Sequence, residues 1–135
     1  MSRERYPALW IGQVAVVTLP VEIDVTNADP IREELLAVLN QGAVLLVADM
    51  SKTDFCDSSG VSALVRVFRR AATSATALRL VVTTPAVLRV LSITGVDRLV
   101  GVYPSVAASL GDPNGQVDQA RPDGATAKAD TDGGA

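Results

Sequence analysis

Residues 43–60 read AVLLVADMSKTDFCDSSG, and this stretch combines a strand, a polar connection and the start of a helix. Ala43 to Ala48 is a continuous apolar run of strand length, which is typical of a central strand covered by helices on its faces. The polar segment 49–57 follows, and it ends in Asp-Ser-Ser-Gly, a sequence suited to the start of a helix. We therefore expect a buried strand, and after it a helix whose first residues lie at the edge of a sheet.

The segment after this stretch predicts a long amphipathic helix. Its apolar face comprises Val61, Leu64, Val65, Phe68, Ala72 and Ala75, and its other face carries Arg66, Arg69 and Arg70. Further along, Leu78 to Val82 and Leu99 to Tyr103 read as strands. Short helices are expected between Thr84-Pro85 and Gly95, and again over 105–110.

The segment before this stretch predicts a hairpin and a helix. Leu9 to Ile11 and Val14 to Leu19 are strand-like runs separated by Gly12-Gln13. A helix with Pro30 in its first turn, capped by Asn27 or Asp29, then repeats apolar residues at helical spacing until Gly42. The resulting order, β-β-α-β-α-β-α-β-α, predicts an α/β fold with a largely parallel sheet.

Length and charge predict one folded domain with a tail. The chain has 135 residues, the size of one domain, and we assign residues 1–110 to the domain and 111–135 to a disordered tail. The tail is poor in apolar residues and holds five of the fifteen acidic residues but only two of the twelve basic ones. The domain is therefore neutral, which argues against a nucleic-acid partner.

Composition also excludes several kinds of chemistry. The chain has no histidine and one cysteine, Cys56, so histidine-based catalysis, histidine-ligated metal sites and thiolate metal clusters are excluded, and we expect no cofactor. Cys56 itself reads as a small buried hydrophobe, with redox sensing as the alternative. No apolar run approaches the roughly 20 residues of a membrane span and no leader opens the sequence, so we expect a cytoplasmic protein without a membrane partner.

The wider pattern resembles the STAS domain, in particular the single-domain anti-sigma factor antagonists. The resemblance runs from Leu19 to about Leu110. It rests on 19–24 (LPVEID), on 47–51 (VADMS) with Phe55, Asp57, Ser58, Ser59, Gly60 and Leu64, and on 84–96 with its Thr-Pro start and Thr-Gly-Val end. It implies a mixed sheet of four or five strands backed by helices, in agreement with the element order.

The resemblance also implies a function and its site. Ser58 would be phosphorylated by an anti-sigma factor with serine-kinase activity, and only the unphosphorylated form would bind that factor and free a sigma factor. Partner-binding residues would be Asp24, Asp57, Ser58, Ser59 and Gly60. Ser59 is the alternative acceptor, and Asp24 is alternatively a solvated turn residue. The protein itself would be a monomer or weak dimer and not an enzyme.

Other interpretations remain open. Asp-Ser-Ser before a helix is most often simple N-capping. A STAS adaptor subunit of a transport or stress-signalling complex is the main functional alternative. A nucleotide-hydrolysing enzyme using Asp24, Asp57 and Ser58 is a weaker one, because no Walker-type glycine-rich loop is present.

Overall fold

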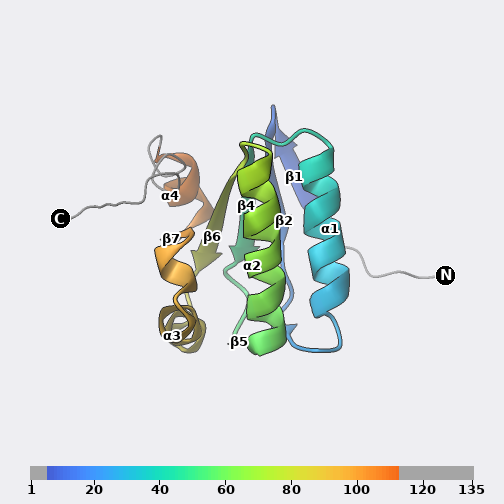
Figure 1. Cartoon of the computed structure of the whole chain (residues 1–135). Coiled ribbons are helices and arrows are strands. Elements are labelled where there is room, and N and C mark those ends of the chain that lie inside the picture. The colour runs from blue at the N-terminus through green and yellow to red at the C-terminus, as the bar shows by residue number, and fades with distance from the viewer. Residues whose placement is uncertain (1–5, 113–135) are drawn as a thin grey trace.

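The computed structural model describes residues 6–112, which are built around a five-stranded sheet (Figure 1). The strands lie in the order β1 (Ala8–Ile11), β2 (Val14–Thr18), β4 (Leu45–Met50), β6 (Ala77–Val82) and β7 (Gly101–Tyr103). β1 pairs antiparallel with β2, and every other neighbouring pair is parallel. The predicted α/β class with a largely parallel sheet is confirmed. The predicted tail, 111–135, lies outside the described residues except for its first two.

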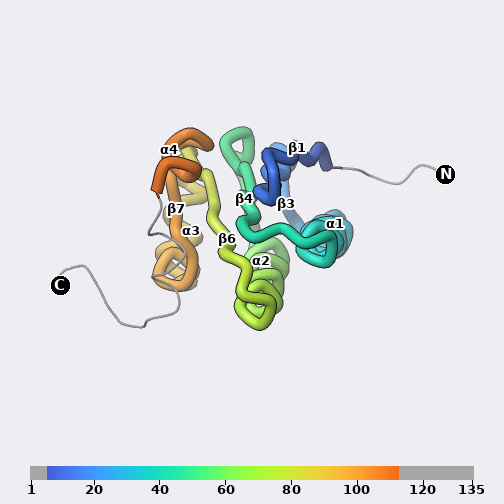
Figure 2. The backbone as a smooth tube through the Cα atoms, turned by 90° about the horizontal axis from the view of Figure 1, so that it is seen from above, coloured from blue at the N-terminus to red at the C-terminus, as the bar shows by residue number. Residues whose placement is uncertain are grey.

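The helices divide between the two faces of this sheet (Figure 2). One face is covered by α1 (Ala28–Asn40), α2 (Ser58–Thr73) and α3 (Pro85–Thr94), which share one apolar core with the strands. The short helix α4 (Val106–Leu110) packs on the other face. A 3₁₀ helix, Val96–Arg98, joins α3 to β7. Among residues 6–112, the helix that covers the second face thus has five residues.

β4 is the central strand, as its apolar sequence predicts. Leu46, Ala48 and Met50 point into the core beneath the long helices, and Val47 packs on the opposite face with Val16 and Val81. Side chains of a strand alternate between the faces of the sheet, so a strand covered on both sides must be apolar at successive positions.

A second, two-stranded sheet was not predicted. β3 (Glu22–Ile23) pairs in parallel with β5 (Phe55–Cys56), which lies inside the segment that we expected to be an irregular connection. Each strand has two residues and pairs across more than thirty positions of the chain. Such short strands have no periodicity that a sequence could reveal.

Several boundaries differ from the predicted ones. β4 runs from Leu45 to Met50, two residues beyond the apolar run, because Asp49 and Met50 continue the backbone pairing with β6. α1 begins at Ala28, and Asn27 is its N-cap residue without a side-chain capping bond. We expected Ala72 and Ala75 on the apolar face of α2, but both are exposed: Ala72 lies in the last turn of the helix, and Ala75 lies beyond its end at Thr73 with a positive φ of 57°.

Candidate functional site

Ser58 is the first residue of α2, and its side chain is exposed. Asp57 is the N-cap residue: one carboxylate oxygen accepts hydrogen bonds from the backbone N–H groups of Ser59 at 2.8 Å and Gly60 at 3.2 Å. The Asp57 carbonyl accepts the N–H of Val61 at 3.1 Å, which begins the helical hydrogen bonding. The helix start is therefore closed by Asp57, and Ser58 is left facing solvent.

Asp24 lies at the same edge as Asp57, because each follows one of two paired strands. β3 ends directly before Asp24, β5 ends directly before Asp57, and the N–H of Asp57 donates to the carbonyl of Ile23 at 3.1 Å. The Asp24 carboxylate accepts bonds from the hydroxyl of Thr26 at 2.5 Å and from its backbone N–H at 2.9 Å. These bonds lower the pKa of Asp24 below its ordinary value of 3.8.

Gly60 lets α2 approach the two-stranded sheet closely. A Cβ atom at this position would lie 2.6 Å from the sulfur of Cys56 and 2.7 Å from Cγ2 of Ile23. The helix start and both short strands therefore meet at Gly60, which is buried.

The loop between β4 and β5 is held by threonine side chains. The hydroxyl of Thr53, which is fully buried, donates to the carbonyl of Pro20 at 2.7 Å. The hydroxyl of Thr84 donates in turn to the carbonyl of Thr53 at 2.9 Å, and that of Thr83 donates to the carbonyl of Ser51 at 3.0 Å. The sequence analysis missed Thr53, because a threonine in a polar segment is typical of an exposed loop.

An exposed apolar rim flanks the edge that carries Ser58. It consists of Val21, Val25 and Phe55, whose exposed fractions are 48%, 75% and 49%. Val21 and Phe55 are also joined through the backbone, since the N–H of Phe55 donates to the carbonyl of Val21 at 3.3 Å. Contiguous apolar patches with polar residues around them are typical of protein-binding surfaces, whereas singly exposed apolar residues are common on any protein. The sequence analysis did not predict this rim: Val21 and Phe55 entered it only as motif residues, and Val25 was not considered.

Cys56 lies beneath this surface and is 4% exposed. Burial, with a smaller contribution from the nearby Asp57 charge, raises the pKa of its thiol to about 11. A thiol with such a pKa is almost entirely protonated at neutral pH and is a poor nucleophile. The prediction that Cys56 serves as a small buried hydrophobe agrees with this environment.

The described residues contain no metal-type cluster. Within 6–112, no group of three or more cysteine, aspartate or glutamate side chains is arranged to hold a metal ion. Over the same range, no helix has both the length and the apolar character needed to cross a membrane.

One family model accounts for most of this fold, since the STAS domain model matches residues 8–109. The chain belongs to the STAS domain family. No curated protein matched the sequence. Among solved structures, an anti-sigma factor antagonist from Mycobacterium paratuberculosis is 25% identical with a TM-score of 0.72, and the match covers 78% of this STAS domain chain and 90% of that chain.

Three further solved structures share the STAS fold. The anti-sigma factor antagonist SpoIIAA, in its unphosphorylated form, is 20% identical with a TM-score of 0.67 over 78% of this chain and 93% of that one. The phosphorylated form of SpoIIAA from Bacillus also matches, with a TM-score of 0.61, 19% identity and coverages of 78% and 96%. A sulfate transporter family protein from Wolinella succinogenes is 17% identical with a TM-score of 0.67, covering 76% and 85%.

Proposed function

We propose that this STAS domain is an anti-sigma factor antagonist, and that phosphorylation of Ser58 switches off its binding to an anti-sigma factor. The observation that carries the proposal is the exposed Ser58 hydroxyl at the first position of α2, directly after the N-cap Asp57. The partner is an anti-sigma factor with serine-kinase activity, which releases a sigma factor when the antagonist binds. Asp24, Asp57, Ser59 and Gly60 complete the binding edge.

The environment of Ser58 favours a switch that acts on the surface. A phosphate adds about −1.5 to −2 charges at neutral pH. The N-terminus of a helix tolerates added negative charge, yet the N–H groups of Ser59 and Gly60 are already bonded to Asp57. The phosphate would therefore extend outward beside the Asp57 carboxylate, where it meets the partner and leaves the core unchanged.

A small energetic effect is sufficient for partner exchange. The apolar rim of Val21, Val25 and Phe55 offers a surface that a partner can cover, and a doubly charged group next to it must lose its hydration when the partner binds. A loss of about 2.7 to 4.1 kcal/mol of binding free energy lowers affinity roughly 100- to 1,000-fold.

The comparisons support this proposal through shared fold. The neighbours include SpoIIAA, an anti-sigma factor antagonist known in unphosphorylated and phosphorylated forms. The sequence identity of these neighbours to this chain is 20% and 19%, so the proposed role of Ser58 is argued from its position as the first residue of α2.

The test uses the full chain, an anti-sigma factor with a kinase domain encoded in the same genome, and ATP. We expect intact-mass measurement to show one added phosphate on the wild type and on Ser62→Ala, a control at an exposed serine of the same helix, but none on Ser58→Ala. Ser58→Ala should bind the factor as the unmodified wild type does, and Ser58→Asp should bind at least about tenfold more weakly. Equal binding by both Ser58 variants would overturn the switch, and phosphate on Ser58→Ala would move the acceptor to another residue.

An adaptor role in a transport complex is the second candidate. The similarity to the sulfate transporter family protein favours it. Purification of the tagged full chain from its own cells distinguishes the two functions. Recovery with membrane transport subunits, and with no anti-sigma factor, would replace the proposal by this alternative.

A further inference from the structure

Within residues 6–112, β1 forms an edge of the five-stranded sheet with no further strand beside it, and its sequence lacks the features that usually prevent such a strand from pairing. Its side chains are Ala8, Leu9, Trp10 and Ile11, and all four residues are exposed. Natural edge strands generally carry a charge, an internal proline or a bulge that prevents pairing with another chain. β1 contains none of these, and its register with β2 is regular from Ala8 to Ile11. This edge is therefore open to a further strand.

The backbone of β1 presents its free hydrogen-bonding groups in a definite pattern. The carbonyl of Pro7 accepts the N–H of Thr18 at 2.9 Å, and antiparallel pairs alternate between bonded and non-bonded positions. The backbone groups of Leu9 and Ile11 therefore face β2, while those of Ala8 and Trp10 face outward. Within residues 6–112, β1 pairs with β2 only. The outward groups thus lie symmetrically on either side of Leu9.

We propose that two copies of this chain pair through β1, antiparallel and with a two-fold axis at Leu9. Ala8 of one copy then exchanges both backbone hydrogen bonds with Trp10 of the second copy, and the reciprocal pair does the same. An antiparallel partner strand needs a donor and an acceptor at alternate positions. The outward backbone groups of β1 in one copy match those of β1 in the second copy in this way. The strand carries no charge, so two copies can approach without like-charge repulsion.

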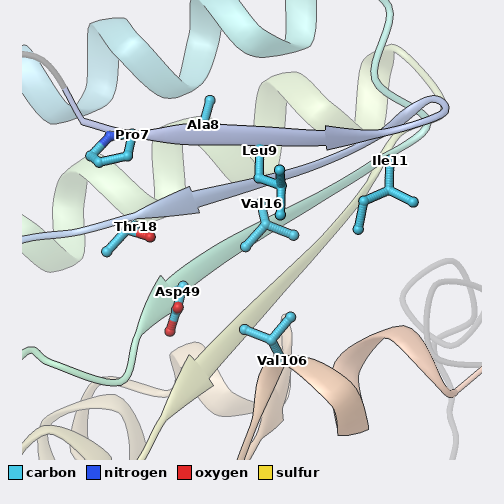
Figure 3. A pocket seen from close by; sticks show the side chains of 8 residues that line it. All are labelled: Pro7, Ala8, Leu9, Ile11, Val16, Thr18, Asp49 and Val106. Carbon is cyan, nitrogen blue, oxygen red and sulfur yellow. The ribbon is translucent and has the colours of Figure 1, made fainter.

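The sheet face beside β1 supplies apolar surface to the same contact (Figure 3). Leu9 and Ile11 point to the side of the sheet that carries Val16, where a hollow of about 280 Å³ opens between β1 and Val106 of α4. Leu9 and Ile11 are 63% and 50% exposed there. With the axis at Leu9, the two Leu9 side chains lie opposite one another at a non-hydrogen-bonded position, where Cβ atoms are roughly 4.5–5.5 Å apart. The uncovered faces of both copies then form one continuous apolar surface.

The expected dimer is weak, and it does not depend on the proposed function. Strands of four residues bury less than the roughly 1,200 Å² of a standard interface. We therefore expect association between micromolar and millimolar protein concentrations. Ser58 is part of neither β1 nor the hollow.

The first experiment is sedimentation velocity on the full chain over this concentration range. The wild type should shift from monomer to dimer, and Leu9→Lys should weaken the dimer by more than about tenfold, because two lysines face each other at the axis. The matched control is Ile93→Lys on α3, at a side chain that is 74% exposed, and it should associate as the wild type does. A wild type that stays monomeric, or a Leu9→Lys variant that associates equally well, overturns the proposal.

Two more variants test the geometry. Leu9→Lys and Leu9→Glu should each be monomeric alone, and their mixture should form a mixed dimer, since opposite charges then meet at the axis. Ala8→Pro removes an outward N–H without touching the β1–β2 bonds, and it should weaken association while the circular dichroism spectrum stays unchanged. A mixture that remains monomeric would exclude the two-fold axis at Leu9, and the edge would then be left for a strand of another protein.

Discussion

Gly60 and Cys56 are packed so closely that a Cβ atom at position 60 would lie 2.6 Å from the Cys56 sulfur, inside the 3.0 Å limit of real Cβ contacts. The same atom would lie 2.7 Å from Cγ2 of Ile23. Position 60 therefore requires glycine for lack of space. The start of α2 can reach the β3–β5 pair only because this side chain is absent.

Gly60→Ala is expected to destabilise the fold. Alanine favours a helix by up to about 1 kcal/mol over glycine, whereas forcing a methyl group into a packed core costs about 1 to 3 kcal/mol. The steric cost should win, and urea unfolding measures the difference. Cys56→Ala removes one of the two atoms that the new methyl group meets, and Cγ2 of Ile23 stays, so the double variant should lose less than the sum of the single losses. Ser62→Ala, at an exposed position of the same helix, is the control and should change stability little.

Asp57→Ala is expected to lower the free energy of unfolding by about 1 kcal/mol. The loss arises because the N–H groups of Ser59 and Gly60 lose their acceptor. Asp57→Asn keeps a side-chain oxygen in the same place and should retain most of the stability. This variant therefore distinguishes the contribution of the capping hydrogen bonds from that of the negative charge. Asp54→Ala is the control, since Asp54 is an exposed acid of the preceding loop. Similar losses for Asp54 and Asp57 would contradict the capping role.

Cys56 is expected to resist alkylation at neutral pH. Its pKa of about 11 means that the thiolate forms in the folded protein only under strongly alkaline conditions, above the ordinary value of 9.0. The folded state favours the protonated thiol, so this group's contribution to stability is complete below pH 9 and is lost as the pH rises toward 11. The iodoacetamide rate, measured by mass spectrometry against pH, should rise near pH 11 when folded and near pH 9 in urea. A rapid reaction of the folded protein at pH 7 would favour redox sensing instead.

Thr26→Val is expected to raise the pKa of Asp24 toward 3.8. The valine lacks the hydroxyl that donates to the carboxylate, which is the largest cause of the lowered pKa, while the backbone bond stays. A carboxylate whose pKa is lowered by folding stabilises the fold at pH values above its pKa in the unfolded state. This contribution disappears as the pH falls through its pKa in the folded state. A ¹³C titration of the Asp24 carboxyl carbon between pH 2 and pH 6 follows the change. Thr73→Val, on α2, should leave the titration unaltered.

The sequence predicted the parts of the fold that carry periodic or capping patterns. The apolar run that begins at Ala43 identified the central strand, and Asp57 with Ser58 identified the start of α2. The far end of that helix was misjudged, since alanine is compatible with buried and exposed positions alike and Ala72 and Ala75 carry no clear preference. The 3₁₀ helix Val96–Arg98 was also missed, because three residues provide no period.

The polar residues at the start of α2 could be predicted from the sequence, whereas the contacts between distant segments that hold the candidate site could not. Asp57 and Ser58 stand next to each other in the chain, so their place at a helix start follows from local preference. The position of Asp24 depends on the pairing of Ile23 with Cys56, a contact between distant segments. The buried state of Thr53 depends on the carbonyl of Pro20, which no local pattern indicates.

The hydrogen bonds from Thr53 to Pro20 and from Thr84 to Thr53 limit where the chain can accept inserted residues. Surface loops commonly accept extra residues. The loop between β4 and β5, however, is bonded at Thr53 to Pro20 and Thr84, and beyond β5 the N–H of Asp57 donates to the carbonyl of Ile23. One residue inserted between Thr53 and Asp57 would shift the pairing register of β5 against β3, and it would displace Asp57 and Ser58 from Ile23 and Asp24. Insertions are instead expected at the turn around Gly12, where the chain is exposed and an added Cβ atom would meet nothing within 4 Å.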